Sequence, residues 1–311
     1  MEERYDGYVE VVNDELRNLS RDVEPDSLSD AVEHVALAGG KRLRPLLTLL
    51  SFEAVTDTHP DTDLDVESQA SLDSDDRDPR FDEALRFAAG VELVHTSALV
   101  ADDIIDRSDV RRGVETVHES YGHDFAVLTS NMLLGKALET IDNQRAVSAM
   151  IDAVENLGEG EAMELSDDLT TVDDYYELAY KKTGSLFVAS CEVGAIAGGV
   201  ADDADEMEAL REYAENLGVA FQIRDDVLDY TSTQEDLGKP VGKDAVLERP
   251  SLVAVHSKST DSRLSDSVEF ALGEADERSE SAKRALDGLE SESKPVDELR
   301  RIAEFAVERS R

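Results

Sequence analysis

Residues 81–106 read FDEALRFAAGVELVHTSALVADDIID, and their apolar side chains recur at steps of three and four residues. This period is typical of an α-helix with a buried face. The pattern returns over residues 204–230 and 295–308. Asn-Gly turns between alternating strands are absent, and no Gly-x-Gly-x-x-Gly follows a strand-like run. We therefore predict an all-α protein of many helices that forms a single domain over residues 1–311.

The 311 residues include 72 acidic and 31 basic side chains, which gives a net charge of −41. This balance excludes nucleic-acid binding through a basic surface. The single cysteine, Cys191, excludes a disulfide framework and a cysteine-based zinc site. The first residues lack the basic-then-apolar pattern of a signal segment, and no apolar run approaches 18 residues. We therefore predict a cytoplasmic protein without stable membrane insertion.

Residues 57–80 depart from the helical pattern, because they carry few large apolar side chains and many carboxylates. Such a segment buries too little apolar surface to pack into a core. We predict an acidic surface loop between two helices.

Two aspartate clusters each follow an apolar helical run. They share the spacing Asp-Asp-x-x-Asp and comprise Asp102, Asp103 and Asp106, and Asp225, Asp226 and Asp229. On a helix, the first and last carboxylates of this spacing lie on one face, where like charges repel unless a cation lies between them. Hard carboxylate oxygens suit Mg²⁺, which is commonly held by one or two carboxylates and by substrate phosphates. The clusters therefore predict Mg²⁺ binding.

Basic residues are scarce in this chain, so their grouping is informative. They concentrate in GGKRLRP (39–45), in Arg111-Arg112 beyond the first cluster, in KKTG (181–184) and in GKPVGKD (238–244). Arg offers phosphate oxygens a planar fork, and Lys offers them a point charge. Each group alone also fits a surface ion pair. Beside two carboxylate clusters, the groups together indicate a cavity that binds diphosphate. No Walker A loop or kinase-type glycine loop is present, which disfavours ordinary nucleotides.

These segments resemble the motifs of the trans-isoprenyl diphosphate synthases. GGKRLRP, ELVHTSALVADDIIDRSDVRRG, KKTGSLF and FQIRDDVLDY followed by GKPVGKD stand in the order of that family, and the match runs from about residue 30 to 250. The resemblance implies a helical bundle around a deep central cavity, usually as a homodimer. It also implies Mg²⁺-dependent condensation of isopentenyl diphosphate with allylic diphosphates, with up to three Mg²⁺ ions per active site.

The resemblance also implies roles for individual residues. The two aspartate clusters would hold Mg²⁺ and face each other across the cavity mouth, and Lys182 would act with them in catalysis. The allylic diphosphate would contact Arg111, Lys182, Thr183, Gln222, Lys239 and Arg249. Isopentenyl diphosphate would contact Lys41, Arg44, His95 and Arg112. Before the resemblance is considered, His95 also fits a satisfied helix histidine.

Three positions depart from the family pattern. Arg249-Pro250-Ser251 stands where a Gly-Lys-x-Thr stretch is common, and arginine can still bind phosphate. Lys136 follows Gly135 where Gly-Asp is common. Glu161 follows Gly160 where Gly-Gln is common.

The resemblance assigns product length to the floor of the cavity. Ser97 and Ala98 lie about one helical turn before Asp102, where short-chain members often carry a large aromatic side chain. Both are small here, which favours a product of C20 or more. Geranylgeranyl diphosphate (C20) is the expected product, and a longer-chain synthase (C25 or more) is the alternative. Two other readings are a class I terpene cyclase, which needs no second diphosphate site, and a non-catalytic subunit of a hetero-oligomeric synthase.

The acidity generates a prediction about salt. A folded chain at −41 repels itself in dilute solution, and salt at 1 M shortens the Debye length to roughly 3 Å. We therefore hypothesise that the protein is halophilic, and we expect it to unfold when dialysed from molar to low salt. Circular dichroism across a salt series measures this, and full stability at low salt would contradict it.

Overall fold

The computed structural model describes residues 5–56, 69, 76–166, 169–237, 250–289 and 293–308, with only the backbone described for 229–237. The chain divides into two compact units. The first comprises Met1–Ile151 and Ala189–Asp202, and the second comprises Asp152–Val188 and Asp203–Arg311. A single domain over 1–311 stays a prediction. Most of the loop predicted at 57–80 lies outside the described residues.

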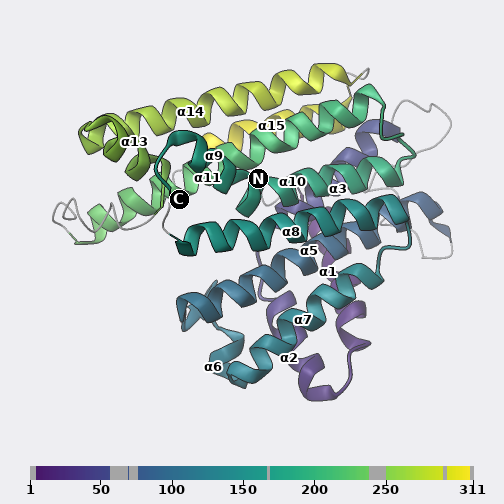
Figure 1. Ribbon diagram of the computed structural model, residues 1–311. Coiled ribbons are helices and arrows are strands. Elements are labelled where there is room, and N and C mark those ends of the chain that lie inside the picture. Colours follow the sequence, from purple (N-terminus) through teal and green to yellow (C-terminus); the bar gives the residue numbers. More distant parts are fainter. Residues whose placement is uncertain are drawn as a thin grey trace. The chain divides into compact units, whose positions relative to one another are not determined.

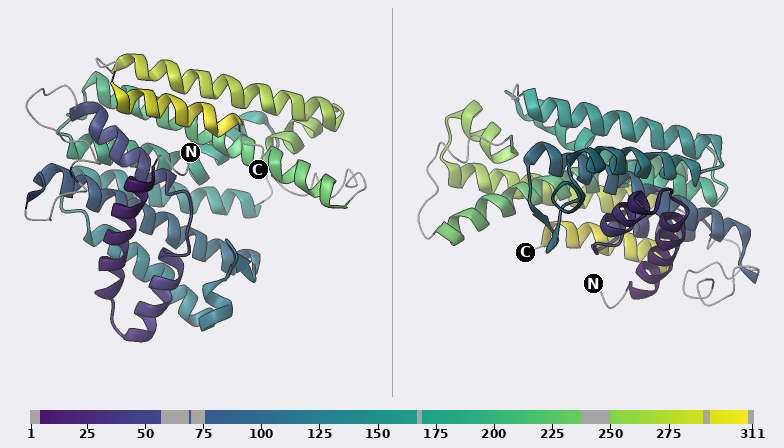
Figure 2. Two further views of the ribbon diagram at one scale, coloured as in Figure 1. Left: turned by 180° about the vertical axis from the view of Figure 1, so that it is seen from behind. Right: turned by 90° about the horizontal axis from the view of Figure 1, so that it is seen from below.

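The first unit is helical and is built around α5 (Pro79–Asp106). Its other helices are α1 (Asp6–Arg21), α2 (Asp26–Ala36), α3 (Leu43–Thr56), α6 (Val117–Tyr121), α7 (His123–Glu139), the start of α8 (Gln144–Ser166) and the end of α10 (Ser185–Ala197). Helix α5 packs against α1, α2, α3, α6 and α7 (Figure 1). The two views of Figure 2 show α1 and α2 as adjacent helices at the purple end of the chain.

Helix α5 has well-defined ends and an apolar middle. Asp78 caps its start by accepting a hydrogen bond from the backbone N–H of Arg80, and Pro79 occupies the first turn, where no N–H is needed. Arg107 ends the helix in the left-handed conformation, with φ 53°. By length and composition α5 could cross a membrane, which corrects the expectation that no apolar run approaches 18 residues. Burial explains its composition, because 72% of that stretch is covered by protein.

A short antiparallel hairpin, β1 (Val110–Arg111) and β2 (Val114–Glu115), follows α5. Arg112 and Gly113 form its two-residue turn, with φ values of 52° and 81°. Two positive φ values are typical of the type I′ turn, whose twist suits a hairpin. This hairpin was not predicted, because Arg112 occupies the turn position at which asparagine is the usual signal.

The second unit is organised around α11 (Asp205–Leu237). Its neighbours are α9 (Val172–Ala179), η3 (Tyr180–Gly184), α13 (Leu252–Thr260), α14 (Leu264–Ala285), η4 (Leu286–Gly288) and α15 (Lys294–Glu308). Figure 1 shows α14 running alongside α11 and α15. Apolar side chains of α9, α11, α13 and α14 form one buried cluster. The prediction of an all-α fold is confirmed.

Element η3 is a π-helical turn whose backbone lies very close to two neighbouring helices, at Gly160 of α8 and at Gly218 of α11. A Cβ on Gly160 of α8 would lie 2.8 Å from the backbone nitrogen of Lys182. A Cβ on Gly218 of α11 would lie 2.5 Å from the Cα of Gly184. Real Cβ atoms do not approach so closely, so only glycine permits these backbones to touch. The side chains of the KKTG segment are thereby fixed close to both α8 and α11.

Candidate functional site

The first aspartate cluster occupies the last turn of α5. Asp103 is buried, Asp102 is half-buried and Asp106 is exposed. Arg111 of the hairpin donates from Nε to Oδ1 of Asp103 over 2.5 Å. The hairpin therefore balances the buried carboxylate, which would otherwise be costly to bury. Asp102 and Asp106, one turn apart, remain on the more accessible part of the helix.

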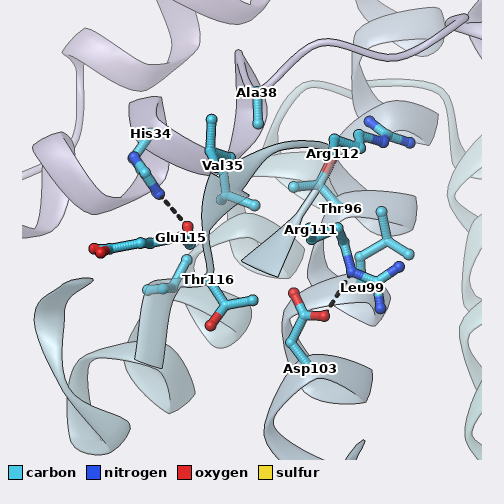
Figure 3. A pocket seen from close by; sticks show the side chains of 12 residues that line it. His34, Val35, Ala38, Thr96, Leu99, Asp103, Arg111, Arg112, Glu115 and Thr116 are labelled. Carbon is cyan, nitrogen blue, oxygen red and sulfur yellow. Dashed lines mark hydrogen bonds and ion pairs between the residues drawn. The ribbon is translucent and has the colours of Figure 1, made fainter. Parts of the chain in front are cut away.

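A pocket lies between this end of α5, the hairpin and α2 (Figure 3). Thr96, Leu99 and Asp103 line it from α5, and His34, Val35 and Ala38 line it from α2 and the residues after it. The hairpin contributes Arg111, Arg112, Val114 and Glu115, followed by Thr116 and Val117. In Figure 3 the Arg111 side chain points to Asp103, and His34 Nε2 lies 2.7 Å from the carbonyl oxygen of Glu115. His34 thus fixes the hairpin to α2.

Several arginine side chains lie near enough to His95 of α5 to affect its charge state. Burial, and then the charges of Arg44 and Arg112, hold the pKa of the His95 ring well below its usual value. The ring is therefore neutral at neutral pH and presents one N–H donor among positive charges. Such a group of donors with excess positive charge suits a multiply charged anion. The structure thus brings together three of the four residues predicted for isopentenyl diphosphate.

The GGKRLRP segment supplies both structural and accessible cations. Arg42 is structural: its Nη1 lies 2.6 Å from Glu92 Oε1, and both side chains are 2% exposed. Lys41 is exposed and Arg44 is half-buried. Gly40 has a φ of 127°, and a Cβ there would overlap the Arg112 guanidinium, which donates to the carbonyl oxygen of Gly39. The two glycines therefore let Arg112 lie against the chain.

The second aspartate cluster lies on α11 and joins a hydrogen-bonded network. Thr183 Oγ1 donates to Gln222 Oε1 over 2.6 Å, and Gln222 Nε2 donates to Asp226 Oδ1 over 2.8 Å. The hydroxyl of Tyr175 donates to Asp226 Oδ2 over 2.6 Å. Tyr175 is 1% exposed, and burial together with Asp226 raises its pKa well above the usual value, so it remains a donor. Thr183, Gln222 and Asp226 were predicted as site residues, whereas Tyr175 was not, because it lies in no recognised motif.

Lys182 pairs with two carboxylates of α8. Its Nζ is 3.2 Å from Glu161 Oε2 and also contacts Glu164 Oε2. The neighbouring Lys181 pairs instead with Glu159 over 2.6 Å and with Glu177 over 3.1 Å. Glu161, noted above as a departure from the family pattern, thus faces a residue predicted to bind the allylic diphosphate.

The remaining predicted site residues are only partly described. Asp225 is half-buried on α11. Asp229 lies on α11, but its side chain, like Lys239 and Arg249, falls outside the described residues. Among the side chains that the structure describes, no three His, Cys, Asp or Glu residues gather closely enough to hold a metal ion. The metal-binding role of the clusters remains a prediction.

The two residues predicted to set product length, Ser97 and Ala98, lie on α5 and differ in how deeply they are buried. Ser97 is 8% exposed, and its Oγ donates to the carbonyl oxygen of Ser130 on α7 over 2.9 Å. Ser130 Oγ donates in return to the carbonyl oxygen of Ser97 over 3.2 Å. Ala98 is half-buried. Small side chains therefore let α5 and α7 approach at this level.

Lys136, farther along α7, pairs with Glu139 over 2.9 Å.

Comparisons with known proteins agree on one family. The family model described as polyprenyl synthetase matches residues 25–289. The chain is 33% identical to a short chain isoprenyl diphosphate synthase of Methanothermobacter thermautotrophicus, over 97% of this chain and 96% of the relative. It is 32% identical to a geranylfarnesyl diphosphate synthase of Natronomonas pharaonis, over 97% and 95%.

A solved structure supports the same assignment. The geranylgeranyl pyrophosphate synthetase of Pyrococcus horikoshii superposes with a TM-score of 0.80 at 30% identity, over 97% of this chain and 96% of that one. The fold and the sequence therefore lead to one conclusion: the chain belongs to the polyprenyl synthetase family and is a prenyltransferase.

Proposed function

We propose that this prenyltransferase condenses isopentenyl diphosphate with allylic diphosphates in an Mg²⁺-dependent reaction, and that geranylgeranyl diphosphate (C20) is its main product. The cluster of Arg44, His95 and Arg112 carries the proposal, because it offers anion-binding donors in the same unit as Asp102 and Asp106. A chain that bound only one diphosphate, such as a terpene cyclase, would not need this second group of cations.

The donor set fits Mg²⁺. In each aspartate cluster the second member is engaged by protein, since Asp103 binds Arg111 and Asp226 accepts from Gln222 and Tyr175. The carboxylates of both clusters would be the metal ligands, namely Asp102, Asp103 and Asp106, and Asp225, Asp226 and Asp229. The first and third aspartates of each cluster lie one helical turn apart. Bound Mg²⁺ would neutralise the developing charge of the leaving diphosphate.

The protein's own residues would bind and orient the two substrates. Arg111, Lys182, Thr183 and Gln222, with Lys239 and Arg249, would hold the allylic diphosphate while its C–O bond breaks. Arg44, Arg112 and the N–H of the neutral His95, with Lys41, would hold isopentenyl diphosphate. The double bond of isopentenyl diphosphate then attacks C1 of the allylic cation. A proton leaves the adduct to the released diphosphate, so no side-chain base is needed.

A C25 product is the second candidate. Ser97 and Ala98 are small, and the relatives include geranylfarnesyl diphosphate synthases of Natronomonas pharaonis and Aeropyrum pernix, each 32% identical. We further propose, from the family resemblance, that the enzyme is a cytoplasmic homodimer. A role as a non-catalytic subunit is disfavoured because both aspartate clusters are complete.

The first test is elongation by the purified chain. In molar salt with Mg²⁺ and labelled isopentenyl diphosphate, we expect dimethylallyl, geranyl and farnesyl diphosphates to be extended to C20. Sizing the dephosphorylated products measures this. A ladder reaching C25 or beyond would replace the C20 proposal, and folded protein without Mg²⁺-dependent elongation from any primer would contradict the proposed activity.

Substitution of Ser97 tests the floor of the cavity. We expect Ser97→Phe to shorten the main product by at least one C5 unit, because an aromatic ring at the proposed floor of the cavity would block the growing prenyl chain. Ser97→Ala is the matched control, since it removes the same hydroxyl without adding bulk, and its product should keep the wild-type length. Chromatography of the products measures both. An unchanged product from Ser97→Phe would place the floor elsewhere.

Tyr175→Phe tests whether Tyr175 positions Asp226. Loss of a hydrogen bond to a carboxylate costs about 1.5 kcal/mol, so we expect kcat to fall about tenfold and the Mg²⁺ concentration for half-maximal activity to rise. Tyr176→Phe is the control, because that hydroxyl donates to Glu274 instead. Mg²⁺ titrations of the initial rate compare the two variants. Equal effects of both substitutions would show that Tyr175 has no special role.

A further inference from the structure

Lys182 is a diphosphate ligand in the proposed function, yet two carboxylates face it in this structure. Its Nζ lies 3.2 Å from Glu161 Oε2 and contacts Glu164 Oε2 as well. The three side chains are 28%, 21% and 32% exposed, so solvent and a dissolved anion can reach them. One positive and two negative charges leave this group with a net charge of −1.

The backbone holds these carboxylates in place. Glu161 and Glu164 are three residues apart on α8, so they lie on the same helical face. Gly160 brings that face against η3, since a Cβ there would lie 2.8 Å from the backbone nitrogen of Lys182. The two side chains can rotate, but α8 cannot withdraw from Lys182 without breaking this close contact.

The arrangement around Lys181 provides an internal comparison. Glu159, also on α8, lies 2.6 Å from Lys181 and is 62% exposed, whereas Glu161 is 21% exposed. An exposed pair of the Glu159 type is screened by water and is worth little. Water screens the charge of Glu161 less than that of Glu159, and Glu161 lies beside Lys182, which is the proposed diphosphate ligand.

We propose that Glu161, together with Glu164, makes Lys182 bind metal-bound diphosphate in preference to metal-free diphosphate. This inference rests on the proposed contact between Lys182 and diphosphate. A metal-free diphosphate would meet net negative charge at this site and would be repelled. A diphosphate that carries a divalent cation would bring its own positive charge and would bind. Glu161 is thus a specificity-determining residue that makes anion binding at Lys182 depend on the metal.

Calorimetric titration with inorganic pyrophosphate tests the proposal, in EDTA and again in excess Mg²⁺. We expect Glu161→Gln to bind metal-free pyrophosphate about tenfold more tightly than the wild type, the effect of removing one charge a few ångströms from the anion at a partly exposed site. In Mg²⁺ the gain should be less than twofold. Glu159→Gln is the matched control: it removes the same charge from the same helix and should change neither affinity.

Lys182→Gln identifies the relevant binding step, because pyrophosphate can also bind at the Arg44, His95 and Arg112 cluster. The pyrophosphate-binding component that Lys182→Gln loses is the one whose affinity is compared between the wild type, Glu161→Gln and Glu159→Gln. If Lys182→Gln loses it and Glu161→Gln matches the wild type, or if Glu159→Gln equals Glu161→Gln, the inference is overturned while the proposed function stands. If Lys182→Gln binds as the wild type does, the proposed Lys182 contact is wrong and the inference fails with it.

Discussion

Like charges on a partly buried part of a helix must be balanced, and this requirement governs the local structure around both aspartate clusters. Asp103 is 2% exposed and has Arg111 beside it, at the cost of a hairpin whose turn places Arg112 in a left-handed conformation. Asp226 accepts hydrogen bonds from the neutral donors of Gln222 and Tyr175. Either solution fixes one carboxylate of its cluster.

The two solutions differ in their electrostatic consequences. An arginine cancels the charge of Asp103, whereas hydrogen bonds from an amide and a phenol leave the negative charge of Asp226 in place. In the first unit, Arg44 and Arg112 lie near His95. Acidic residues of the same unit balance part of the positive charge of this region, as Glu92 does for Arg42. Arg42, Arg44, Arg111 and Arg112 gather near His95, although the chain carries a net charge of −41.

Much of the helical fold could be predicted from sequence, because it depends on short-range patterns, whereas the roles of most candidate site residues were implied by the family resemblance. The period of residues 81–106 fixes a buried helix, and Asp-Asp-x-x-Asp fixes which carboxylates share a face. The hairpin could not be predicted, because its turn uses Arg112-Gly113 rather than a recognised turn pair. Tyr175 and Glu164 could not be found either, since their roles depend on contacts between different helices, Tyr175 with Asp226 and Glu164 with Lys182, that no local spacing encodes.

The π-helical turn η3 sets the rotational register of the residues on either side of it. A π turn closes its hydrogen bond from residue i to i+5, one residue later than an α turn, and one residue corresponds to about 100° of rotation in an α-helix. Tyr175 before the turn and Phe187 after it both reach α11, where they meet Asp226 and Phe221. A chain shortened by one residue between them would present one of these side chains about a quarter-turn away from α11. Insertions and deletions are therefore constrained at this segment more tightly than its sequence composition suggests.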